Sequence, residues 1–239
     1  MAYRPFIRRS VEQAPVLTLQ HPDLPRDPAR QSWWGRLTVR ITRAIMARYL
    51  EWYHRIECSG TEHVPRTGPL LVVANHASNL DPLALAYGIR RPLHFLAARG
   101  LFRIPPVAYV LRQWGALPVA PGGLDIAAVR TCVTILRTGG ALAIFPEGTR
   151  SRDGRLQPFQ SGPARMAILA RAPVLPAGIL GTFEALPPGA LFPKPVKLRV
   201  RYGRPFELAE YYNRRLTAED VATATARLRD AVATLLDSW

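Results

Sequence analysis

Cysteine, lysine and long hydrophobic runs are scarce or missing in this sequence of 239 residues. The only cysteines are Cys58 and Cys132, so a disulfide framework is excluded, and we expect both thiols to be reduced and structural. No apolar run reaches the roughly 18 residues that a membrane-spanning helix needs, so none is predicted. The N-terminus carries arginines but lacks a continuous apolar core, which argues against a secretory signal peptide.

Acidic residues are in the minority, and the formal net charge is +15. Nearly all of the positive charge is arginine, because Lys194 and Lys197 are the only lysines. An arginine excess can follow genome base composition, but positive charge of either type attracts nucleic acid or anionic lipid headgroups. No nucleic-acid-binding signature accompanies the charge, so no nucleic-acid partner is predicted.

The apolar content of 48% excludes general disorder, and the length suits one α/β domain with a short extension. Residues 1–31 are interrupted repeatedly by proline and predict an irregular arm. Residues 32–57 predict an N-terminal amphipathic helical extension, and residues 58–239 predict the folded domain itself.

In residues 32–57, apolar side chains recur at helical spacing while arginines occupy the opposite face. The apolar positions are Trp33, Leu37, Ile41, Ala44, Ile45, Tyr49, Trp52 and Ile56, and the basic positions are Arg36, Arg40 and Arg43. A helix that is basic on one side and aromatic or aliphatic on the other is typical of a membrane interface. The same pattern also fits a helix packed on the domain core, so both interpretations stay open.

Strand candidates alternate with helix candidates in the rest of the chain. Strands are predicted at Leu70–Ala74, Pro92–Ala97, Ala141–Phe145, Val174–Leu180 and Val196–Tyr202, and helices after Asp81, over Leu124–Thr138 and Gly162–Arg171, and from Thr217, where Asp220 completes a capping box. This alternation predicts an α/β fold with a central, mostly parallel or mixed sheet flanked by helices and with ligands at the strand ends. The apolar segment Leu101–Pro121 could be core, line a channel or touch a membrane.

The polar turn Asn75–Pro82 follows the first buried strand. Pro82 suits the first turn of a helix, with Asp81 as its N-cap. The turn can fold the Asp81 carboxylate back onto one imidazole nitrogen of His76, which leaves the other nitrogen free to take a proton. The pair would then act as a general base on a substrate hydroxyl, with no protein nucleophile. Alternatively, Asp81 only caps the helix and His76 only bonds to backbone.

A second polar turn, Phe145–Ser151, follows another buried strand. Gly148 permits a tight turn, Thr149 offers a donor, and Arg150 offers a planar cationic fork for phosphate. Glu147 is predicted either to bind hydroxyls or to brace Arg150. The alternative is a structural turn that carries a surface ion pair.

These motifs resemble those of the glycerolipid acyltransferases, the 1-acyl-sn-glycerol-3-phosphate and glycerol-3-phosphate O-acyltransferases. Asn75–Pro82 is similar to the family's His-x4-Asp block, Phe145–Ser151 to its acceptor-phosphate block, and Val174–Ile179 to a late block near the acyl donor. The order and spacing of the blocks agree as well, so the resemblance covers about residues 55–205, and we expect it to extend to the whole domain.

The resemblance implies a glycerol-3-phosphate acyltransferase-like fold and an enzyme that moves a fatty acyl group from acyl-CoA or acyl carrier protein to a lysophospholipid. The expected acceptor is 1-acyl-sn-glycerol-3-phosphate. Catalytic roles are implied for His76 and Asp81, and substrate-binding roles for Asn75, Ser78, Glu147, Gly148, Thr149, Arg150 and Pro176. No cofactor or metal is implied. The lipid acceptor implies peripheral or monotopic attachment to the cytoplasmic face of the cell membrane.

One block departs from the family pattern. Pro121 stands where the family usually has an arginine that helps to hold the acceptor phosphate. Arg103 or Arg112 could supply that contact instead, and Arg99 could replace a further basic residue that the family often has just before this block. Otherwise the acceptor is a different lysolipid or alcohol, or the chain is a lipid-binding relative without turnover.

Overall fold

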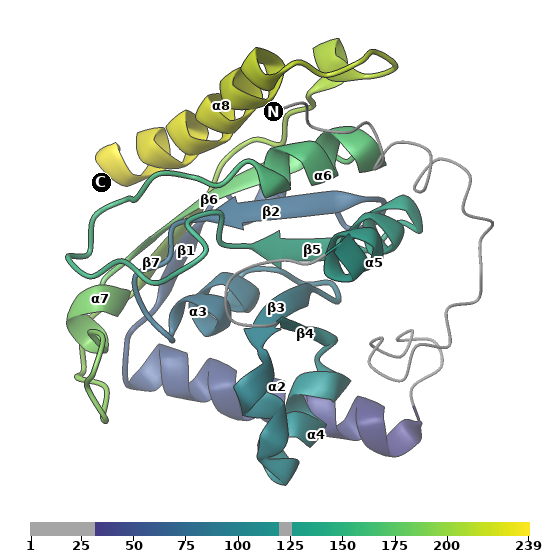
Figure 1. Ribbon diagram of the computed structural model, residues 1–239. Coiled ribbons are helices and arrows are strands. Elements are labelled where there is room, and N and C mark those ends of the chain that lie inside the picture. The colour runs from purple at the N-terminus through teal and green to yellow at the C-terminus, as the bar shows by residue number, and fades with distance from the viewer. Residues whose placement is uncertain (1–31, 120–125) are drawn as a thin grey trace.

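The computed structural model describes residues 32–119 and 126–239, so the predicted arm (1–31) and Pro121 lie outside the described residues. Within the described part of the chain, seven strands form one sheet in the order β1-β7-β6-β2-β5-β3-β4 (Figure 1). Neighbouring strands are parallel except β6 and β7, which are antiparallel. The predicted α/β fold with a mostly parallel or mixed sheet is therefore confirmed.

The strands include all five predicted ones, some with ends shifted by up to three residues, and two that were not predicted. They are β1 (Glu57–Ser59), β2 (Leu70–Ala74), β3 (His94–Ala98), β4 (Ala116–Val119), β5 (Ala141–Ile144), β6 (Val174–Leu180) and β7 (Arg199–Tyr202). The sequence does not predict β1, which falls at the end of the segment expected to be helical. Nor does it predict β4, which lies inside the apolar segment Leu101–Pro121.

Helices lie between several of these strands, before the first strand and after the last. They are α2 (Trp33–Trp52), α3 (Asp81–Tyr87), α4 (Pro105–Gln113), α5 (Ile126–Arg137), α6 (Gly162–Ala170), α7 (Thr182–Ala185) and α8 (Ala218–Asp237), with short 3-10 helices η2 (Thr61–His63), η3 (Arg99–Arg103) and η4 (Ala209–Tyr211). The predicted capping box at the start of α8 is confirmed. The Thr217 hydroxyl accepts from the Asp220 amide, and the Asp220 carboxylate accepts from the Thr217 amide.

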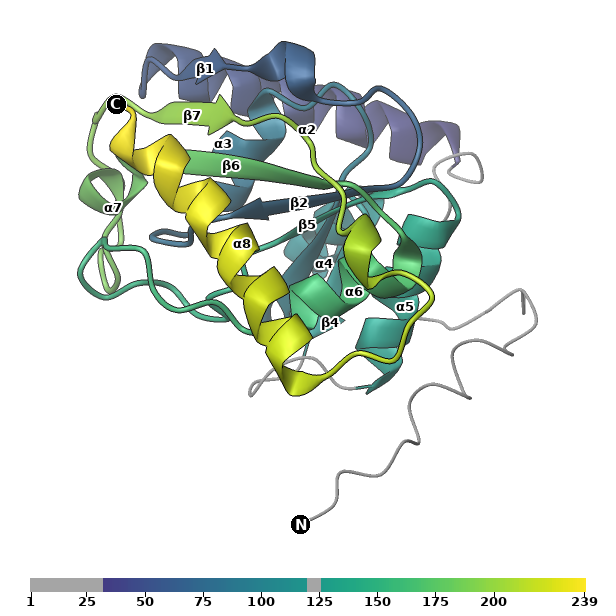
Figure 2. The same ribbon diagram turned by 90° about the horizontal axis from the view of Figure 1, so that it is seen from above.

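The sheet separates two apolar cores. Helices α5, α6 and α8 cover one face, while α3, α2 and α4 lie on the other (Figures 1 and 2). Successive residues of a strand point to opposite faces, so Leu71 and Val73 pack toward α5, α6 and α8. Leu70 and Val72 pack toward α3. A strand that is buried on both faces has to be apolar at every position, which explains the unbroken apolar run before His76.

Helix α2 is shorter than the sequence predicts. It ends at Trp52 rather than at residue 57, with Tyr53 as its C-cap. Arg55 then adopts a positive φ of 48°, a left-handed conformation that cannot continue a helix. Glu57 pairs with Arg199 in the adjacent strand β7, so the last residues of the expected helix join the sheet.

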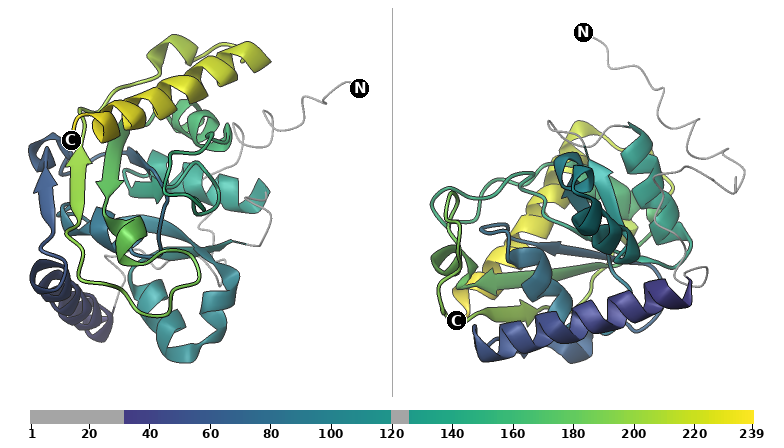
Figure 3. Two further views of the ribbon diagram at one scale, coloured as in Figure 1. Left: turned by 90° about the vertical axis from the view of Figure 1, so that its left-hand side faces the viewer. Right: turned by 90° about the horizontal axis from the view of Figure 1, so that it is seen from below.

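The apolar stripe of α2 faces outward. Only Gly35 and Leu50 are buried in this helix, whereas the large exposed side chains are Trp33, Trp34, Leu37, Ile41, Ile45 and Trp52. Figure 3 shows α2 along the outside of the molecule in the view from below. Tyr49 and Ile56 pack against the core, but the other large side chains of the stripe do not, so packing of the whole stripe on the core is wrong. Among the described residues, no helix is long and apolar enough to cross a membrane.

Leu142 tests the assignment of the core. It is fully buried in the interior strand β5, so Leu142→Ala should lower the free energy of unfolding by about 2–5 kcal/mol. Urea denaturation followed by circular dichroism measures the change. The matched control is Leu191→Ala, since Leu191 is 87% exposed and its truncation should change stability by less than about 0.5 kcal/mol. Equal losses in the two variants would contradict the assignment.

Candidate active site

The two polar turns meet at one edge of the sheet. Strands β2 and β5 are parallel neighbours, so the turns that follow them lie side by side. The backbone joins them directly, because the Ser151 amide donates to the His76 carbonyl at 2.7 Å. The two motifs, about 70 residues apart in the sequence, are therefore adjacent in the structure.

The imidazole of His76 is held by Asp81. His76 Nδ1 lies 2.8 Å from Asp81 Oδ2, and the carboxylate is fully buried. The same oxygen accepts from the backbone amides of Ala77 and Ser78, at 2.6 and 2.7 Å. One carboxylate oxygen thus fixes both the shape of the turn and the orientation of the ring.

Asp81 is not the N-cap of its helix, contrary to the prediction. Leu80 is the N-cap residue, and Asp81 is the first residue of α3. An N-cap side chain accepts from amides further along its own helix. The Asp81 carboxylate instead points back to three donors that precede it, so the alternative of a simple capping residue is wrong.

The remaining nitrogen of the ring is available for chemistry. With Nδ1–H donated to Asp81, Nε2 carries the lone pair. None of the described residues forms a hydrogen bond with Nε2, and the His76 side chain is 18% exposed. The ring stacks on Phe145, with centroids 4.3 Å apart and planes 20° from parallel. The sequence signal for Phe145 was its place at the end of β5, but its contact with His76 was not predicted.

Asn75 and Ser78 tie the turn to the neighbouring strand and helix. The Asn75 amide group donates to the Ile179 carbonyl at 2.9 Å and accepts from the Ile179 amide at 2.8 Å. Ser78 Oγ donates to the Leu186 carbonyl at 2.8 Å. These contacts are structural, and the substrate-binding role of the two side chains stays a prediction.

Glu147 braces His76 rather than Arg150. Its Oε1 accepts from the His76 amide at 2.7 Å, and its Oε2 from the Gln157 amide at 3.3 Å. Both hydrogen bonds that described residues make to this carboxylate therefore come from backbone. Burial raises the pKa of Glu147 to about 7, against the lowering effect of the two amides. Nothing in the local sequence indicates Gln157 as a partner.

The turn that carries Arg150 is open to a ligand. Gly148 has a positive φ of 74°, and a side chain there would collide with Gln160. Gly148 and Thr149 are exposed and Arg150 is half-buried. Among the described residues, no hydrogen bond or ion pair involves the Arg150 guanidinium, so its charge can meet an anion.

The other predicted contacts lie further from His76. Pro176 is inside β6, opposite Val73, and its carbonyl accepts from the Gly203 amide. Its proposed place near the acyl donor stays a prediction. Arg99 begins η3 directly after β3, at the sheet edge that carries His76, and its role as the family's additional basic residue stays a prediction.

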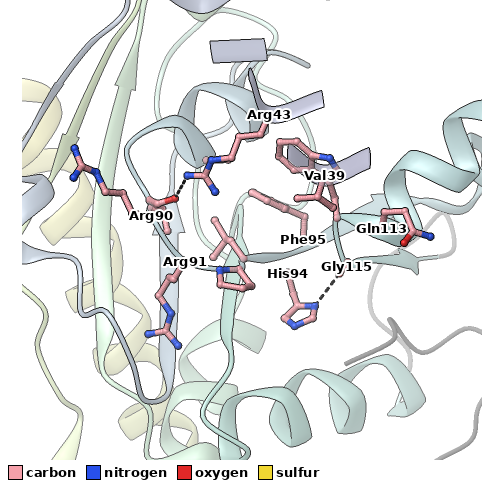
Figure 4. Close-up of a pocket in the computed structure, with 13 residues that line it drawn as sticks. Val39, Arg43, Arg90, Arg91, His94, Phe95, Gln113 and Gly115 are labelled. Carbon is pink, nitrogen blue, oxygen red and sulfur yellow. Dashed lines mark hydrogen bonds between the residues drawn. The ribbon is translucent and has the colours of Figure 1, made fainter. Parts of the chain in front are cut away.

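A cavity of about 170 Å³ lies at the opposite edge of the sheet. Its wall includes His94, the first residue of β3, together with residues of α2 and the end of α4 (Figure 4). His94 Nδ1 lies 3.0 Å from the Gly115 carbonyl, and burial lowers the pKa of His94. Arg43 donates to the Ile89 carbonyl. These contacts are structural, and the cavity is remote from the His76 motif.

The fold and the site together define an α/β protein with a carboxylate-oriented histidine beside a cationic turn. A family model described as Acyltransferase matches residues 55–180, more than half of the chain. The chain belongs to the Acyltransferase family.

Relatives support this assignment. A chloroplastic 1-acyl-sn-glycerol-3-phosphate acyltransferase of Brassica napus is 30% identical over 141 residues, 58% of this chain and 41% of that protein. A 1-acyl-sn-glycerol-3-phosphate acyltransferase of Borreliella burgdorferi is 32% identical over 130 residues, 54% of this chain and 52% of that protein. The chain thus spans about half or less of the length of these curated relatives.

The fold is shared with a solved structure. The 1-acyl-sn-glycerophosphate acyltransferase PlsC of Thermotoga maritima superposes with a TM-score of 0.67 at 23% identity. The match covers 96% of this chain and 88% of that one. At this identity the likeness establishes the architecture alone.

The pH dependence of stability tests the environment of Glu147. Its pKa is raised from 4.5 to about 7, so the folded protein holds this proton more tightly than the unfolded chain. The stability that this proton provides is complete below pH 4.5 and is lost as pH rises through about 7. Glu147→Gln cannot titrate and should lack that decline, as urea unfolding across this range would measure. Glu62→Gln, at an exposed carboxylate, should keep the wild-type profile; parallel curves for all three proteins would contradict the assignment.

Proposed function

We propose that this chain is an O-acyltransferase that moves a fatty acyl group from a thioester to the hydroxyl of a lysophospholipid. The observation that carries the proposal is the His76 ring, held through Nδ1 by Asp81 and open at Nε2, beside the turn of Arg150. Family membership supports the reaction class. The names of the relatives support 1-acyl-sn-glycerol-3-phosphate as the acceptor and a place in phospholipid biosynthesis.

In the proposed mechanism, Nε2 of His76 takes the proton of the acceptor hydroxyl as its oxygen attacks the thioester carbon. Asp81 stabilises the imidazolium that forms. The tetrahedral intermediate then collapses, the carbon–sulfur bond breaks, and the thiolate recovers the proton from His76. No covalent acyl-enzyme forms, because the acceptor supplies the nucleophile.

The oxyanion of the intermediate needs donors. The amides of His76, Ala77 and Ser78 already bond to carboxylates, so they are not available. The amides of Thr149 and Arg150 form no hydrogen bond with the described residues, and we propose them as donors.

The proposed binding roles follow from the charge of the acceptor phosphate and from the thioester chemistry of the donor. Arg150 would hold the acceptor phosphate, and Gly148 and Thr149 would line the approach to it. The donor would be acyl-CoA or acyl carrier protein, and we propose no cofactor or metal for this chemistry. Glycerol phosphate and a panel of lysolipids, offered with labelled acyl-CoA and read by product mass, would identify the acceptor.

His76→Ala tests the proposed base. Loss of general-base catalysis should lower kcat by about 10²–10⁴-fold, measured with purified protein, acyl-CoA and the preferred lysolipid. The control is His63→Ala, because His63 contacts the Tyr202 carbonyl and lies outside both motifs; it should retain activity. Undiminished turnover by His76→Ala would refute the assigned role.

We further propose that the protein attaches peripherally to the cytoplasmic face of the cell membrane through α2. The exposed stripe of α2 supports this contact. So do Leu101, Ile104 and Val107, which are exposed in and beside α4, next to α2. Arginines of the chain would meet anionic headgroups.

The double variant Ile41→Ser/Ile45→Ser tests the contact through α2. Both side chains are exposed, at 49% and 63%, so the substitutions should leave folding intact while removing apolar area from the interface. Binding to phosphatidylcholine vesicles that contain phosphatidylglycerol should fall by about tenfold or more, measured by co-sedimentation. Binding equal to that of the wild type would exclude α2 as the anchor.

A further inference from the structure

The connection between α7 and β7 carries two of the most exposed large apolar side chains among the described residues. Leu191 is 87% exposed and Phe192 is 83% exposed; we call this pair the 191–192 tip. Of the large apolar side chains in residues 32–119 and 126–239, only that of Trp52, at the end of α2, is exposed to the same degree, at 89%. Two adjacent apolar side chains directed into water favour a partner that would cover them.

The tip lies beside the end of α2. Figure 1 shows the connection after α7 descending next to the C-terminal end of that helix. Tyr53, the residue after Trp52, donates its hydroxyl to the Pro193 carbonyl at 2.8 Å. Two segments distant in sequence, each of which carries exposed apolar side chains, are therefore joined by a hydrogen bond.

The tip is mounted on a firmly bonded loop. The Lys194 amide donates to the Ala185 carbonyl at 2.7 Å, and the Ala190 amide to the Pro187 carbonyl at 3.1 Å. His54 Nδ1 lies 3.0 Å from the Val196 carbonyl. Because the backbone on both sides is bonded, the exposure of the tip is a property of the fold.

The loop is also attached to the catalytic turn. Helix α7 follows β6 directly, at the sheet edge that carries His76. The Leu186 carbonyl accepts from Ser78 Oγ at 2.8 Å, one residue from the Ala185 carbonyl that holds Lys194. Whatever covers the tip therefore lies near the proposed active site.

The charge around the tip favours an anionic surface. Both lysines of the chain, Lys194 and Lys197, lie in this connection and are exposed. Lys197 and Arg199 share one acidic neighbour, Glu57, at 2.6 and 3.8 Å, which leaves the region positive. A second copy of this chain would bring the same positive charge against it, whereas anionic headgroups complement it.

We propose that Leu191 and Phe192 insert into an anionic bilayer as a second anchor beside α2, with Lys194 at the headgroups. This proposal rests on the membrane attachment proposed above and adds its orientation. The contact proposed above joins α2 to α4, which packs against the N-terminal half of that helix. The tip adds a contact at the other end of α2, and we propose that this fixes the tilt of the domain and brings the edge with His76 to the surface where lipid acceptors reside.

The first experiment compares Leu191→Ser/Phe192→Ser with Ile126→Ser, a matched change at an exposed residue (59%) of α5. Co-sedimentation with phosphatidylcholine vesicles, with and without phosphatidylglycerol, measures binding. The tip variant should bind the anionic vesicles about tenfold or more weakly, and the control should bind like the wild type. Wild-type binding by the tip variant, at an unchanged thermal midpoint, would overturn the proposal.

The second experiment locates the tip directly. Phe192→Cys and Ile126→Cys are each labelled with an environment-sensitive nitrobenzoxadiazole dye, which the buried Cys132 and half-buried Cys58 should not take up in a brief reaction. Anionic vesicles should shift the emission of the label at position 192 to the blue and leave the label at position 126 unchanged. No shift at position 192 on vesicles that bind the protein would overturn the proposal.

Three outcomes separate this proposal from the ones it rests on. If the wild type does not bind vesicles, membrane attachment itself fails. If binding depends on Ile41 and Ile45 but not on the tip, only the second anchor fails. If sedimentation velocity shows that the wild type is a dimer and the tip variant a monomer, the tip is an interface between copies and the lipid assignment is overturned.

Turnover of a short-chain, monomeric lysolipid should be unchanged in the tip variant, since the tip acts on the surface contact and not on the chemistry.

Discussion

Everything at the site depends on one buried carboxylate oxygen. Asp81 Oδ2 receives the His76 ring and the amides of Ala77 and Ser78. A buried carboxylate is costly unless donors surround it, so the turn stays in the conformation that supplies all three. The same requirement that keeps the turn folded also orients the imidazole, and stability and chemistry at this point have one cause.

Three strands of the sheet hold the turn of His76 in place. β2 ends in the turn itself, β6 holds Asn75 through the backbone of Ile179, and the turn after β5 supplies Glu147, which accepts from the His76 amide. In effect, Asn75 extends the β2–β6 ladder by one side chain. When the acceptor hydroxyl is the nucleophile, the main task of the protein is to position the catalytic base relative to the substrates. These hydrogen bonds fix the position of His76.

The sequence indicated five of the seven strands, the two motifs and the capping box because each is a local pattern. Predictions from the sequence failed where a side chain's partner is distant in the sequence or where a pattern fits two structures. Asn75 and Glu147 are polar residues at strand ends and suggested ligand contacts, but their partners include Ile179, 104 residues away. The three-residue strand β1 is too short to leave a pattern. Periodicity showed that α2 has an apolar stripe, yet only the packing shows which side of the helix meets the domain.

An amphipathic helix usually packs its apolar face on the domain core, whereas α2 exposes most of its large apolar side chains. This arrangement is the strongest argument that α2 contacts a lipid surface. It docks partly through polar groups: Thr42 Oγ1 accepts from Trp114 Nε1 at 2.8 Å, and Arg43 donates to the Ile89 carbonyl. Its large apolar side chains are left outside. Each would gain about 1.5–3 kcal/mol on full burial, so a stripe of them kept in water forgoes much of the stability that the helix could provide. That loss is recovered if the natural environment of the stripe is the boundary of a bilayer, which is also where a lysophospholipid acceptor would be found.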